Sequence, residues 1–456
     1  MIEATDVVVV GMGVGGESVA GRVAEAGWAV VGIDARLVGG ECPYWGCVPS
    51  KMMTRAANAL AEARRVTALA GQATVTPDYA PVAERIRVEV TDDWDDRVAV
   101  ERFEAKGGRL VRGFARLDGT GRVRVDGATF EAERGVVIAT GTAPSIPPLP
   151  GLDRIDYWTN REAIEAKDLP ASLVVLGGGT VGLELAQVFA RFGTTVTVVE
   201  AEERLLPVEE PEAGALVGEV LQSEGIDVRT GTPARFADRD SSGLIVGLDD
   251  GSLLRAERLL VATGRRADLA ALGIASAGVD ESAPAIAVDD RLRVLGTERM
   301  WGVGDVTGMG AFTHVAAYQA GIAAADLLGE DPPPADYRAV PRVTFTDPEV
   351  GSVGQSEAAA RAAGLTVRVG AAQVPRSARG WIHKVGNEGL VKLVEDASRG
   401  SLVGATSVGP HGGEVLGMLT LAVHAEVPTE QLRRMIYAYP TFHRTVEDAL
   451  RALTAQ

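Results

Sequence analysis

The first 34 residues contain two short apolar runs separated by a glycine-rich turn and a helical pattern. Residues Val7–Val10 form a continuous apolar run, which is typical of a parallel strand buried on both faces. The run leads through the turn Gly11–Gly16 into a helical pattern that ends near Gly27, and a second apolar run, Ala29–Ile33, ends at Asp34. The pattern predicts a strand, a helix and a second strand parallel to the first.

The glycines between the first strand and the helix have the spacing of a dinucleotide-binding turn. Gly11 stands where the turn is tight, Gly13 where the backbone approaches a pyrophosphate, and Gly16 where the helix packs on the strand. Asp34 ends the second strand, where an acid binds a ribose hydroxyl. The glycine spacing alone is a weak signal, but strand, helix and terminal acid together predict a nucleotide site at the start of the helix.

The same pattern recurs later in the chain. Leu173–Leu176 is an apolar run, a helical pattern follows to Phe192, and the run Thr195–Val199 ends in Glu200. The first turn of this copy carries the corresponding glycines, Gly177, Gly179 and Gly182. Two nucleotide sites on one chain suggest a flavin and a nicotinamide working in series, so we expect FAD and NAD(P)H as cofactors. A degenerate second copy is disfavoured, because both copies keep the glycines and the acid.

The rest of the chain divides at proline-rich segments. Residues of roughly 85–135 contain polar alternating stretches such as Arg122–Val125, which predict an antiparallel insertion. Pro144–Gly151 is typical of a connection between domains, and Pro332–Pro334 marks another break. Residues 335–456 mix strand-like and helical patterns. The predicted fold class is therefore α/β, with two Rossmann-like dinucleotide-binding domains and a C-terminal α+β domain.

Composition and charge exclude several classes of function. The 456 residues are too many for one hydrophobic core, so two or three domains are expected. The formal net charge of −17 disfavours nucleic acid and anionic membranes as partners, because both attract concentrated Lys and Arg. No stretch approaches the roughly 20 apolar residues of a spanning helix, and the N-terminus lacks the pattern of a secretory signal. We therefore expect a cytoplasmic protein with a small-molecule substrate and with neither nucleic acid nor membrane as partner.

Cys42 and Cys47 are the only cysteines of the chain. A structural disulfide framework would need more cysteines spread along the chain, and no Cys and His spacing typical of zinc is present, so we predict no metal site. For an isolated pair, an incidental role competes with a redox role. The context favours the redox role, since Pro49 and Ser50 open a predicted helix whose N-terminal dipole, together with Lys51, favours a thiolate at Cys47.

The run from Cys42 to Lys51 resembles the redox motif of the class I pyridine nucleotide–disulfide oxidoreductases. The resemblance covers essentially the whole chain, because further landmarks of this family follow in order at Ala139-Thr140-Gly141, Ala262-Thr263-Gly264-Arg265, Trp301–Asp305, Thr313–Ala316 and Val343–Glu349. It implies an FAD-binding domain of residues 1–146 with 268–334, an NAD(P)-binding domain of residues 147–267, and a dimerisation domain of residues 335–456. It also implies a homodimer in which the last domain completes the partner's active site.

The resemblance also implies a role for each candidate site residue. Cys47 resembles the flavin-side sulfur, which forms the charge-transfer thiolate, and Cys42 resembles the sulfur that exchanges with the substrate. Lys51 is similar to the lysine near the flavin N5, and Glu184 to its acidic partner on the nicotinamide side. The remaining cofactor contacts outside the glycine turns are implied at Asp34, Thr140, Gly141, Gly264 and Asp305.

The acid that ends the second unit favours NADH over NADPH. A carboxylate at Glu200 accepts hydrogen bonds from ribose hydroxyls and repels a 2′-phosphate. Arg204 lies a few residues further on and is the competing signal, because it could face such a phosphate or instead cap the loop.

The C-terminal region departs from the family pattern. Members that reduce lipoamide or glutathione disulfide carry a His-Pro-Thr-x-x-Glu segment there, whereas this chain has Tyr439-Pro440-Thr441-Phe442-His443-Arg444. A histidine titrates at about pH 6.5 and can carry the proton of a dithiol, whereas a phenol titrates at about pH 10. Tyr439 can still donate a hydrogen bond or contact a metal ion. His443, further along a predicted helix, is a candidate substitute base, although a packing or solvated role is favoured for it.

These features predict a flavoprotein that passes hydride from NAD(P)H through FAD to the Cys42–Cys47 disulfide and on to a disulfide or thiol-type acceptor. The alternative is a metal-ion or quinone reductase in which the dithiol or the flavin delivers electrons directly. A non-catalytic FAD-binding scaffold or redox sensor is disfavoured, because the cysteines, Lys51, Glu184 and both glycine turns are intact. Lipoamide and glutathione disulfide are expected to be poor substrates.

Overall fold

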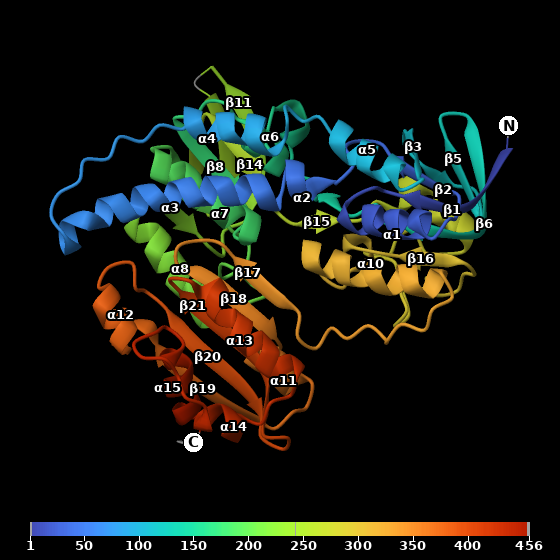
Figure 1. The fold of residues 1–456 in the computed structure, drawn as a ribbon. Coiled ribbons are helices and arrows are strands. Elements are labelled where there is room, and N and C mark those ends of the chain that lie inside the picture. Colours follow the sequence, from blue (N-terminus) through green and yellow to red (C-terminus); the bar gives the residue numbers. More distant parts are fainter. Residues whose placement is uncertain (1, 242, 454–456) are drawn as a thin grey trace. The chain divides into compact units, whose positions relative to one another are not determined.

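The computed structural model describes residues 2–241 and 243–453, and Figure 1 shows their helices and strands in chain order. The chain folds into two compact units, each assembled from separate stretches of sequence. The first unit comprises residues 1–49, 84–145 and 264–337, and the second comprises residues 50–83, 146–263 and 338–456.

The first unit is built on a mixed sheet of order β3–β2–β1–β6–β5–β4, with β16 also pairing with β6. The pairing is parallel among β3, β2, β1, β6 and β16, and antiparallel among β4, β5 and β6. Residues Val7–Val10 of β1 are buried, as the continuous apolar run predicts for a strand covered on both faces. The strands of this unit are β1 Ile2–Val10, β2 Val30–Asp34, β3 Arg109–Arg112, β4 Arg116–Leu117, β5 Arg122–Val125, β6 Ala128–Ile138 and β16 Met300–Gly302, with a separate ladder of β7 Ala143–Pro144 and β15 Arg265–Arg266.

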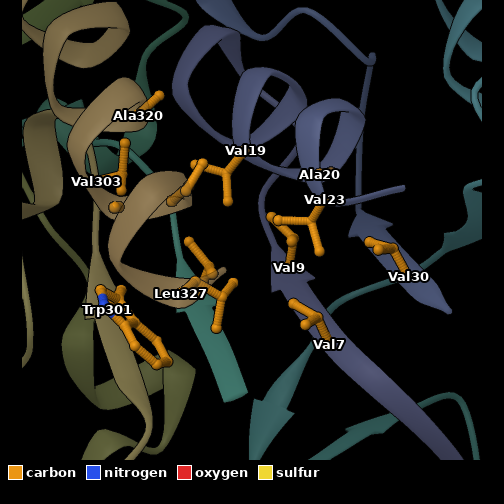
Figure 2. Packing of buried hydrophobic residues seen from close by; sticks show 14 of the residues in the cluster. Val7, Val9, Val19, Ala20, Val23, Val30, Trp301, Val303, Ala320 and Leu327 are labelled. Carbon is orange, nitrogen blue, oxygen red and sulfur yellow. The ribbon is translucent and has the colours of Figure 1, made fainter. Parts of the chain in front are cut away.

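The helices α1 and α10 of the first unit pack against each other and share one apolar core with β1. Val7 and Val9 of β1, Val19 and Val23 of α1, and Leu327 of α10 lie in this core (Figure 2). The core fixes the end of β1 and the start of α1, and thereby the glycine turn between them. The helical elements are α1 Val14–Glu25, α2 Glu41–Tyr44, the π-helix η1 Ile86–Val90, α5 Arg97–Ala105, α9 Leu269–Leu272, η3 Ile274–Ala277, η4 Asp305–Thr307 and α10 Thr313–Leu327.

The prediction of an antiparallel insertion over residues 85–135 is wrong for the first part of this range. That part forms the helical elements η1 and α5, and β3 then pairs in parallel with β2. Ala99 and Phe103 of α5 are both buried. They lie one helical turn apart, and this spacing of apolar residues outweighs the polar composition that suggested strands. The antiparallel pairing is limited to β4, β5 and β6.

A parallel sheet of order β10–β9–β8–β14 carries the second strand–helix–strand pattern, in the second unit. A separate antiparallel sheet, β11–β12–β13, precedes β14 in the chain. The predicted strands at Leu173–Leu176 and Thr195–Val199 and the helix that ends at Phe192 are confirmed. The elements of this part are α3 Cys47–Leu69 and α4 Ala80–Arg85, which both extend into the first unit, and η2 Leu152–Arg154, α6 Asn160–Glu165, β8 Ser172–Leu176, α7 Thr180–Phe192, β9 Thr195–Val199, α8 Pro211–Ser223, β10 Asp227–Arg229, β11 Ala234–Asp240, β12 Gly243–Leu248, β13 Leu253–Ala256 and β14 Arg258–Val261.

An antiparallel sheet of order β17–β18–β21–β20–β19 forms the C-terminal part of the second unit. The helices α13 and α15 pack on it, and Leu393, Leu419 and Leu450 lie at the centre of their shared core. The C-terminal region is therefore α+β, and the predicted α/β fold class is confirmed. The elements are β17 Pro341–Thr344, β18 Glu349–Gly354, α11 Glu357–Ala362, β19 Val367–Gln373, η5 Val374–Arg376, α12 Ala378–His383, β20 Leu390–Asp396, β21 Ser401–Gly409, α13 Gly412–His424, α14 Thr429–Arg434 and α15 Arg444–Ala452.

Candidate active site

The first glycine turn, between β1 and α1, leaves no room for a side chain at two of its positions. Gly11 has a φ of +92°, and a Cβ atom there would lie 2.4 Å from the carbonyl oxygen of Ala139. A Cβ atom on Gly16 would lie 1.9 Å from the carbonyl oxygen of Gly11. Gly13 faces open space instead, since the atom nearest its Cβ position is the Gly40 Cα at 3.9 Å. The turn is therefore closed at its two ends and leaves the backbone accessible at Gly13.

Asp34, the last residue of β2, is hydrogen-bonded to this turn. Its Oδ2 accepts a hydrogen bond from the Met12 N–H at 2.7 Å, and its Oδ1 accepts one from the Arg36 N–H at 2.7 Å. Burial raises the pKa of the Asp34 carboxyl above its ordinary value, and the two hydrogen bonds and the charge of Arg112 oppose this rise. Each oxygen keeps a further lone pair, so an ionised Asp34 can still accept a hydrogen bond from a ribose hydroxyl.

Asp305, the first residue of η4, is joined to two other predicted cofactor segments. Its Oδ2 accepts a hydrogen bond from the Thr142 hydroxyl at 2.9 Å. Arg265 donates to the same threonine, from Nε to the hydroxyl at 3.0 Å and from Nη2 to the carbonyl oxygen at 2.7 Å. Burial raises the pKa of the Asp305 carboxyl. The predicted contacts that neighbour this group in the chain are Thr140, Gly141 and Gly264.

The second glycine turn, between β8 and α7, repeats the geometry of the first. Gly177 has a φ of +112°, and a Cβ atom there would lie 2.3 Å from the carbonyl oxygen of Ala262. A Cβ atom on Gly182 would lie 2.1 Å from the carbonyl oxygen of Gly177. No described atom lies within 4 Å of the Cβ position of Gly179. The backbone is again accessible only at the middle glycine.

Glu200 has the same relation to the second turn as Asp34 has to the first. Its Oε2 accepts a hydrogen bond from the Gly178 N–H at 2.6 Å, and its Oε1 accepts one from the Glu202 N–H at 2.8 Å. Arg204 binds its own loop, because its Nη1 donates to the carbonyl oxygen of Glu209 at 2.7 Å and its Nη2 to that of Pro207 at 2.5 Å. Two roles are predicted for Arg204, and the structure shows the one in which it caps its own loop.

Cys42 and Cys47 lie together in the first unit as two thiols without a disulfide bond. Cys42 belongs to α2, and Cys47 is the first residue of α3, so this helix begins two residues before the predicted start at Pro49. The Cys47 Sγ lies 3.3 Å from the hydroxyl oxygen of Thr313, the first residue of α10. A hydrogen bond to Cys47, together with burial, raises the pKa of the Cys42 thiol. The hydrogen bond and burial thus disfavour ionisation of the Cys42 thiol, a hydrogen bond with Thr313 opposes this effect, and Cys47 is placed to accept hydrogen bonds.

Lys51 and Glu184 form an ion pair within the second unit. The Lys51 Nζ lies 2.7 Å from Glu184 Oε2. The other oxygen, Oε1, accepts a hydrogen bond from the Phe345 N–H at 2.8 Å. The Glu184 side chain is 4% exposed and that of Lys51 33%. A charged partner on one oxygen and a backbone donor on the other offset the cost of burying this carboxylate.

Tyr439 and His443 do not share a helix, so the prediction that His443 follows Tyr439 along one helix is wrong. The helix α15 begins only at Arg444. Pro440 lacks a backbone N–H and restricts the residue before it, which keeps this segment out of a helix. Tyr439 is 71% exposed, and the Arg444 guanidinium lies 5.5 Å from the centroid of its ring.

The sequence does not predict two contacts of the candidate site. Thr313 is only a landmark in the sequence, yet its hydroxyl lies beside Cys47. Phe345 binds Glu184 through its backbone, and the centroid of its ring lies 4.7 Å from the Lys51 Nζ. Both residues are far in sequence from their partners. A hydroxyl at the start of a helix is the one signal available for Thr313, and no sequence signal points to Phe345.

Each unit carries part of the predicted site. The first holds one glycine turn, its acid and the thiol pair, and the second holds the other glycine turn, its acid and the Lys51–Glu184 pair. These features define a class of α/β oxidoreductases that use two nucleotides and a dithiol. The chain belongs to the pyridine nucleotide-disulphide oxidoreductase family: the family model matches residues 5–321, and the model of its dimerisation domain matches residues 340–450.

Relatives and solved structures match almost the whole chain. A mercuric reductase of Streptomyces lividans is 33% identical, with 99% of this chain and 96% of that protein covered. A dihydrolipoyl dehydrogenase of Thermus scotoductus is also 33% identical, with 99% and 98% covered. Among solved structures, the HOCl-induced flavoprotein disulfide reductase RclA from Escherichia coli has a TM-score of 0.85 at 26% identity, with 98% of this chain and 99% of that chain covered. LpdA from Mycobacterium tuberculosis has a TM-score of 0.85 at 26% identity, with 99% of each chain covered. The predicted family is confirmed.

The chain is therefore a flavoprotein oxidoreductase that uses FAD and NAD(P)H. The first glycine turn fits a dinucleotide, because the backbone is accessible at Gly13, a helix begins beside it, and Asp34 retains acceptor capacity. The second turn fits the other nucleotide on the same grounds at Gly179 and Glu200. FAD, when bound, supplies a group that takes up the two electrons of a hydride and passes them on.

Proposed function

We propose that this chain is an NADH-dependent reductase that passes electrons through Cys42 and Cys47 to a disulfide or related thiol-exchange acceptor. The observation that carries the proposal is the contact between the two thiols, with the Thr313 hydroxyl 3.3 Å from the Cys47 Sγ. Two thiols in contact form a disulfide when they lose two electrons and two protons, and the reverse step restores them.

The two cysteines have different roles in this proposal. Cys42 is the exchanging sulfur: its thiol first gives up its proton to solvent, and the sulfur then attacks one sulfur of the acceptor disulfide, forms a mixed disulfide and releases the first thiolate. The Cys47 thiolate then attacks the Cys42 sulfur, which restores the Cys42–Cys47 disulfide and releases the second thiolate. The two released thiolates take up two protons. The hydroxyl of Thr313 can stabilise a thiolate at Cys47, because it can donate a hydrogen bond to a deprotonated sulfur.

The environment of Glu200 supports NADH as the electron donor. The carboxylate is fixed by two backbone N–H groups beside the second glycine turn, where it would face a 2′-phosphate. The guanidinium of Arg204 is committed to two carbonyl oxygens of its own loop and so does not offset this repulsion. We assign Lys51 and Glu184 to the reduction of the flavin by this nucleotide.

A metal-ion reductase is the second candidate function. Tyr439 replaces the histidine that carries protons to leaving thiolates, whereas a thiophilic metal ion that accepts electrons releases no thiolate that needs a proton. Mercuric reductases are among the relatives, and RclA has been solved as a copper(II) complex. Both observations favour a soft metal ion as the alternative acceptor.

We further propose a homodimer formed through the region that matches the dimerisation-domain model. Large apolar side chains are exposed in this region, including Trp381 at 74% and Ile436 at 95%. Such side chains are favourably buried in a subunit interface. Across residues 2–241 and 243–453, no helix is both long and apolar enough to cross a membrane.

An anaerobic titration of the FAD-loaded protein with NADH tests the main proposal. Two-electron reduction is expected to give a long-wavelength charge-transfer band, which depends on the Cys47 thiolate. A panel of disulfides, quinones and metal ions then identifies the acceptor. The proposal fails if the Cys42→Ser and Cys47→Ser variants show the native spectrum and reduce every acceptor at the native rate.

A further inference from the structure

The helix α7 carries a row of polar side chains along one face. The row consists of Thr180, Glu184, Gln187 and Arg191, whose spacing of three or four residues places them on the same side of the helix. Glu184, Gln187 and Arg191 are buried. Buried polar groups are costly without hydrogen-bond partners, so this row needs a polar partner along its length.

The first half of the row binds the end of β17 and the residue after it. The hydroxyl oxygens of Thr180 and Thr344 lie 2.8 Å apart. One helical turn further on, Glu184 Oε1 accepts the hydrogen bond from the Phe345 N–H at 2.8 Å. Successive turns of the helix therefore hold successive residues of this segment.

The second half of the row holds Asp347. The side-chain amide of Gln187 accepts a hydrogen bond from the Asp347 N–H and donates one to the Asp347 carbonyl oxygen, both at 2.8 Å. The Arg191 Nη2 lies 2.8 Å from Asp347 Oδ2, and the Arg65 Nη2 lies 2.7 Å from the same oxygen. The backbone on the C-terminal side of Phe345 is thus fixed as firmly as that on its N-terminal side.

The ring of Phe345, held between these two anchors, lies against the Lys51–Glu184 ion pair. Its centroid is 4.7 Å from the Lys51 Nζ, which is within the range of a cation–π contact. The same Nζ lies 2.7 Å from Glu184 Oε2 and 3.3 Å from the Ser50 hydroxyl. Lys51, Glu184 and Phe345 therefore form a closed set in which each residue contacts the other two.

We propose that Phe345 is a positioning residue that holds the Lys51 ammonium group for the reduction of the flavin by NADH. Its backbone N–H fixes the carboxylate that pairs with the ammonium group, and its ring restricts where that group lies. Lys51 needs such a restriction, because its side chain is 33% exposed and has a long, flexible stem. This proposal rests on the role assigned to Lys51 and Glu184 in the proposed function.

The ring can be removed without removing the backbone contact, which separates positioning from simple packing. Phe345→Leu keeps the N–H and much of the apolar volume but removes the π face, whereas Phe345→Tyr keeps the ring. Phe236→Leu is the matched control, because it removes another partly exposed ring from a different sheet of the same unit. A packing role alone predicts the same behaviour for the two leucine variants.

The first measurement is the rate at which Lys51 is acetylated in the FAD-loaded protein, read by peptide mass spectrometry against the exposed Lys167 as internal reference. A cation–π contact at a partly exposed site is expected to slow the reaction by about two- to fivefold. Phe345→Leu should therefore speed acetylation of Lys51 by about two- to fivefold, whereas Phe345→Tyr and Phe236→Leu should leave it at the native rate. An unchanged rate in Phe345→Leu overturns the proposal.

The second measurement is stopped-flow reduction of the flavin by NADH. Phe345→Leu is expected to lower the limiting rate by about five- to tenfold while the Kd for NADH stays within about twofold, because the nucleotide contacts are not changed. Phe345→Tyr should restore the native rate. Faster acetylation with a native reduction rate would also overturn the proposal, since Phe345 would then hold Lys51 without serving the reaction.

The two readouts also separate this inference from the proposed function. If NADH does not reduce the native flavoprotein, the proposed function fails, whatever the acetylation rates are. If NADH does reduce it and the Phe345 variants match the native protein in both readouts, only the positioning role of Phe345 fails.

Discussion

Each of the two units contains one strand–glycine–helix motif, and the two motifs have almost the same turns but different helices. A Cβ atom on the last glycine would lie 1.9 Å from a carbonyl oxygen in the first unit and 2.1 Å from one in the second. The helix α1, however, buries only small and apolar side chains, whereas α7 also buries Glu184, Gln187 and Arg191. The shared turn geometry fits the nucleotide that is expected at the start of each helix. The helix surface is set by what each helix packs against.

The segments that follow Asp34 and Glu200 also differ in what they contact. Beyond Asp34 the chain leads to Cys42 and Cys47. Beyond Glu200 it leads to Glu209 and Glu210, which pair with Arg342 at 3.0 Å and with Lys392 at 2.9 Å. The loop of the first unit thus contains the two cysteines of the proposed dithiol. The loop of the second unit is tied to the C-terminal sheet by ion pairs.

The largest expected effect comes from adding one methyl group to each turn. Gly16→Ala is expected to yield a protein without FAD and without NADH-dependent activity, because the new Cβ forces α1 away from Gly11. Gly182→Ala is expected to retain FAD but to lose flavin reduction by NADH on the order of 10²-fold, since small displacements of a bound reactant have effects of that size. Flavin absorbance per chain and stopped-flow reduction measure the two outcomes.

The control for this comparison is Gly417→Ala in α13, where no described atom lies within 4 Å of the new Cβ. It should match the native protein in both readouts. If Gly16→Ala binds FAD as tightly as this control does, the assignment of the first turn to FAD is wrong.

The cysteine pair gives the next largest effect, and it belongs to the first unit alone. Cys47→Ser is expected to abolish the charge-transfer band and all acceptor reduction that passes through the dithiol. Cys42→Ser is expected to leave Cys47 as a thiolate and so to show the band without added reductant. Absorption spectra of both variants, recorded before and after NADH, decide the question. A native spectrum in either variant contradicts the dithiol assignment.

Lipoamide tests the C-terminal region, whose Tyr439 and Arg444 have no counterpart in the two strand–glycine–helix motifs. The native protein is expected to reduce lipoamide slowly, because general acid–base help of the missing kind contributes about 10²–10⁴ in rate. The double variant Tyr439→His, Arg444→Glu is expected to recover part of this factor. Steady-state turnover of lipoamide with NADH measures both. Turnover of about 10² per second or more in the native protein would show that another base, first of all His443, replaces the missing histidine.

The turns and their acids could be predicted from sequence, because local spacing decides them. The glycine turn and Asp34 lie close together, as the Met12–Asp34 hydrogen bond shows, because the two strands pair in parallel around the helix that joins them. The pairing of Glu184 with Lys51 is implied by the family resemblance, but its contact with Phe345 could not be predicted, since Phe345 meets it only after residues distant in the chain have folded together. The segment before α15 is not helical although the pattern around His443 predicts a helix, because Pro440 disfavours a helical conformation at the residue before it.

The smallest expected effect concerns Glu200, the acid beside the second turn, and the preference for NADH over NADPH. NADH is expected to exceed NADPH in kcat/KM, because the Glu200 carboxylate is fixed by two backbone N–H groups where a 2′-phosphate would lie. Glu200→Ala should narrow the ratio of the two kcat/KM values by about tenfold, which corresponds to about 1.4 kcal/mol.

Glu203→Ala is the matched control, since it removes an exposed carboxylate from the same loop without touching the turn. It should leave the ratio unchanged, which separates a local repulsion from a general effect of the negative net charge. Arg204→Ala addresses the competing signal. Its guanidinium caps the loop, so the variant is expected to lose some stability but to keep the native ratio. A selective loss of NADPH use in Arg204→Ala would mean that the guanidinium leaves the loop to bind the 2′-phosphate, and the second turn would then differ from the first in its choice of charge as well.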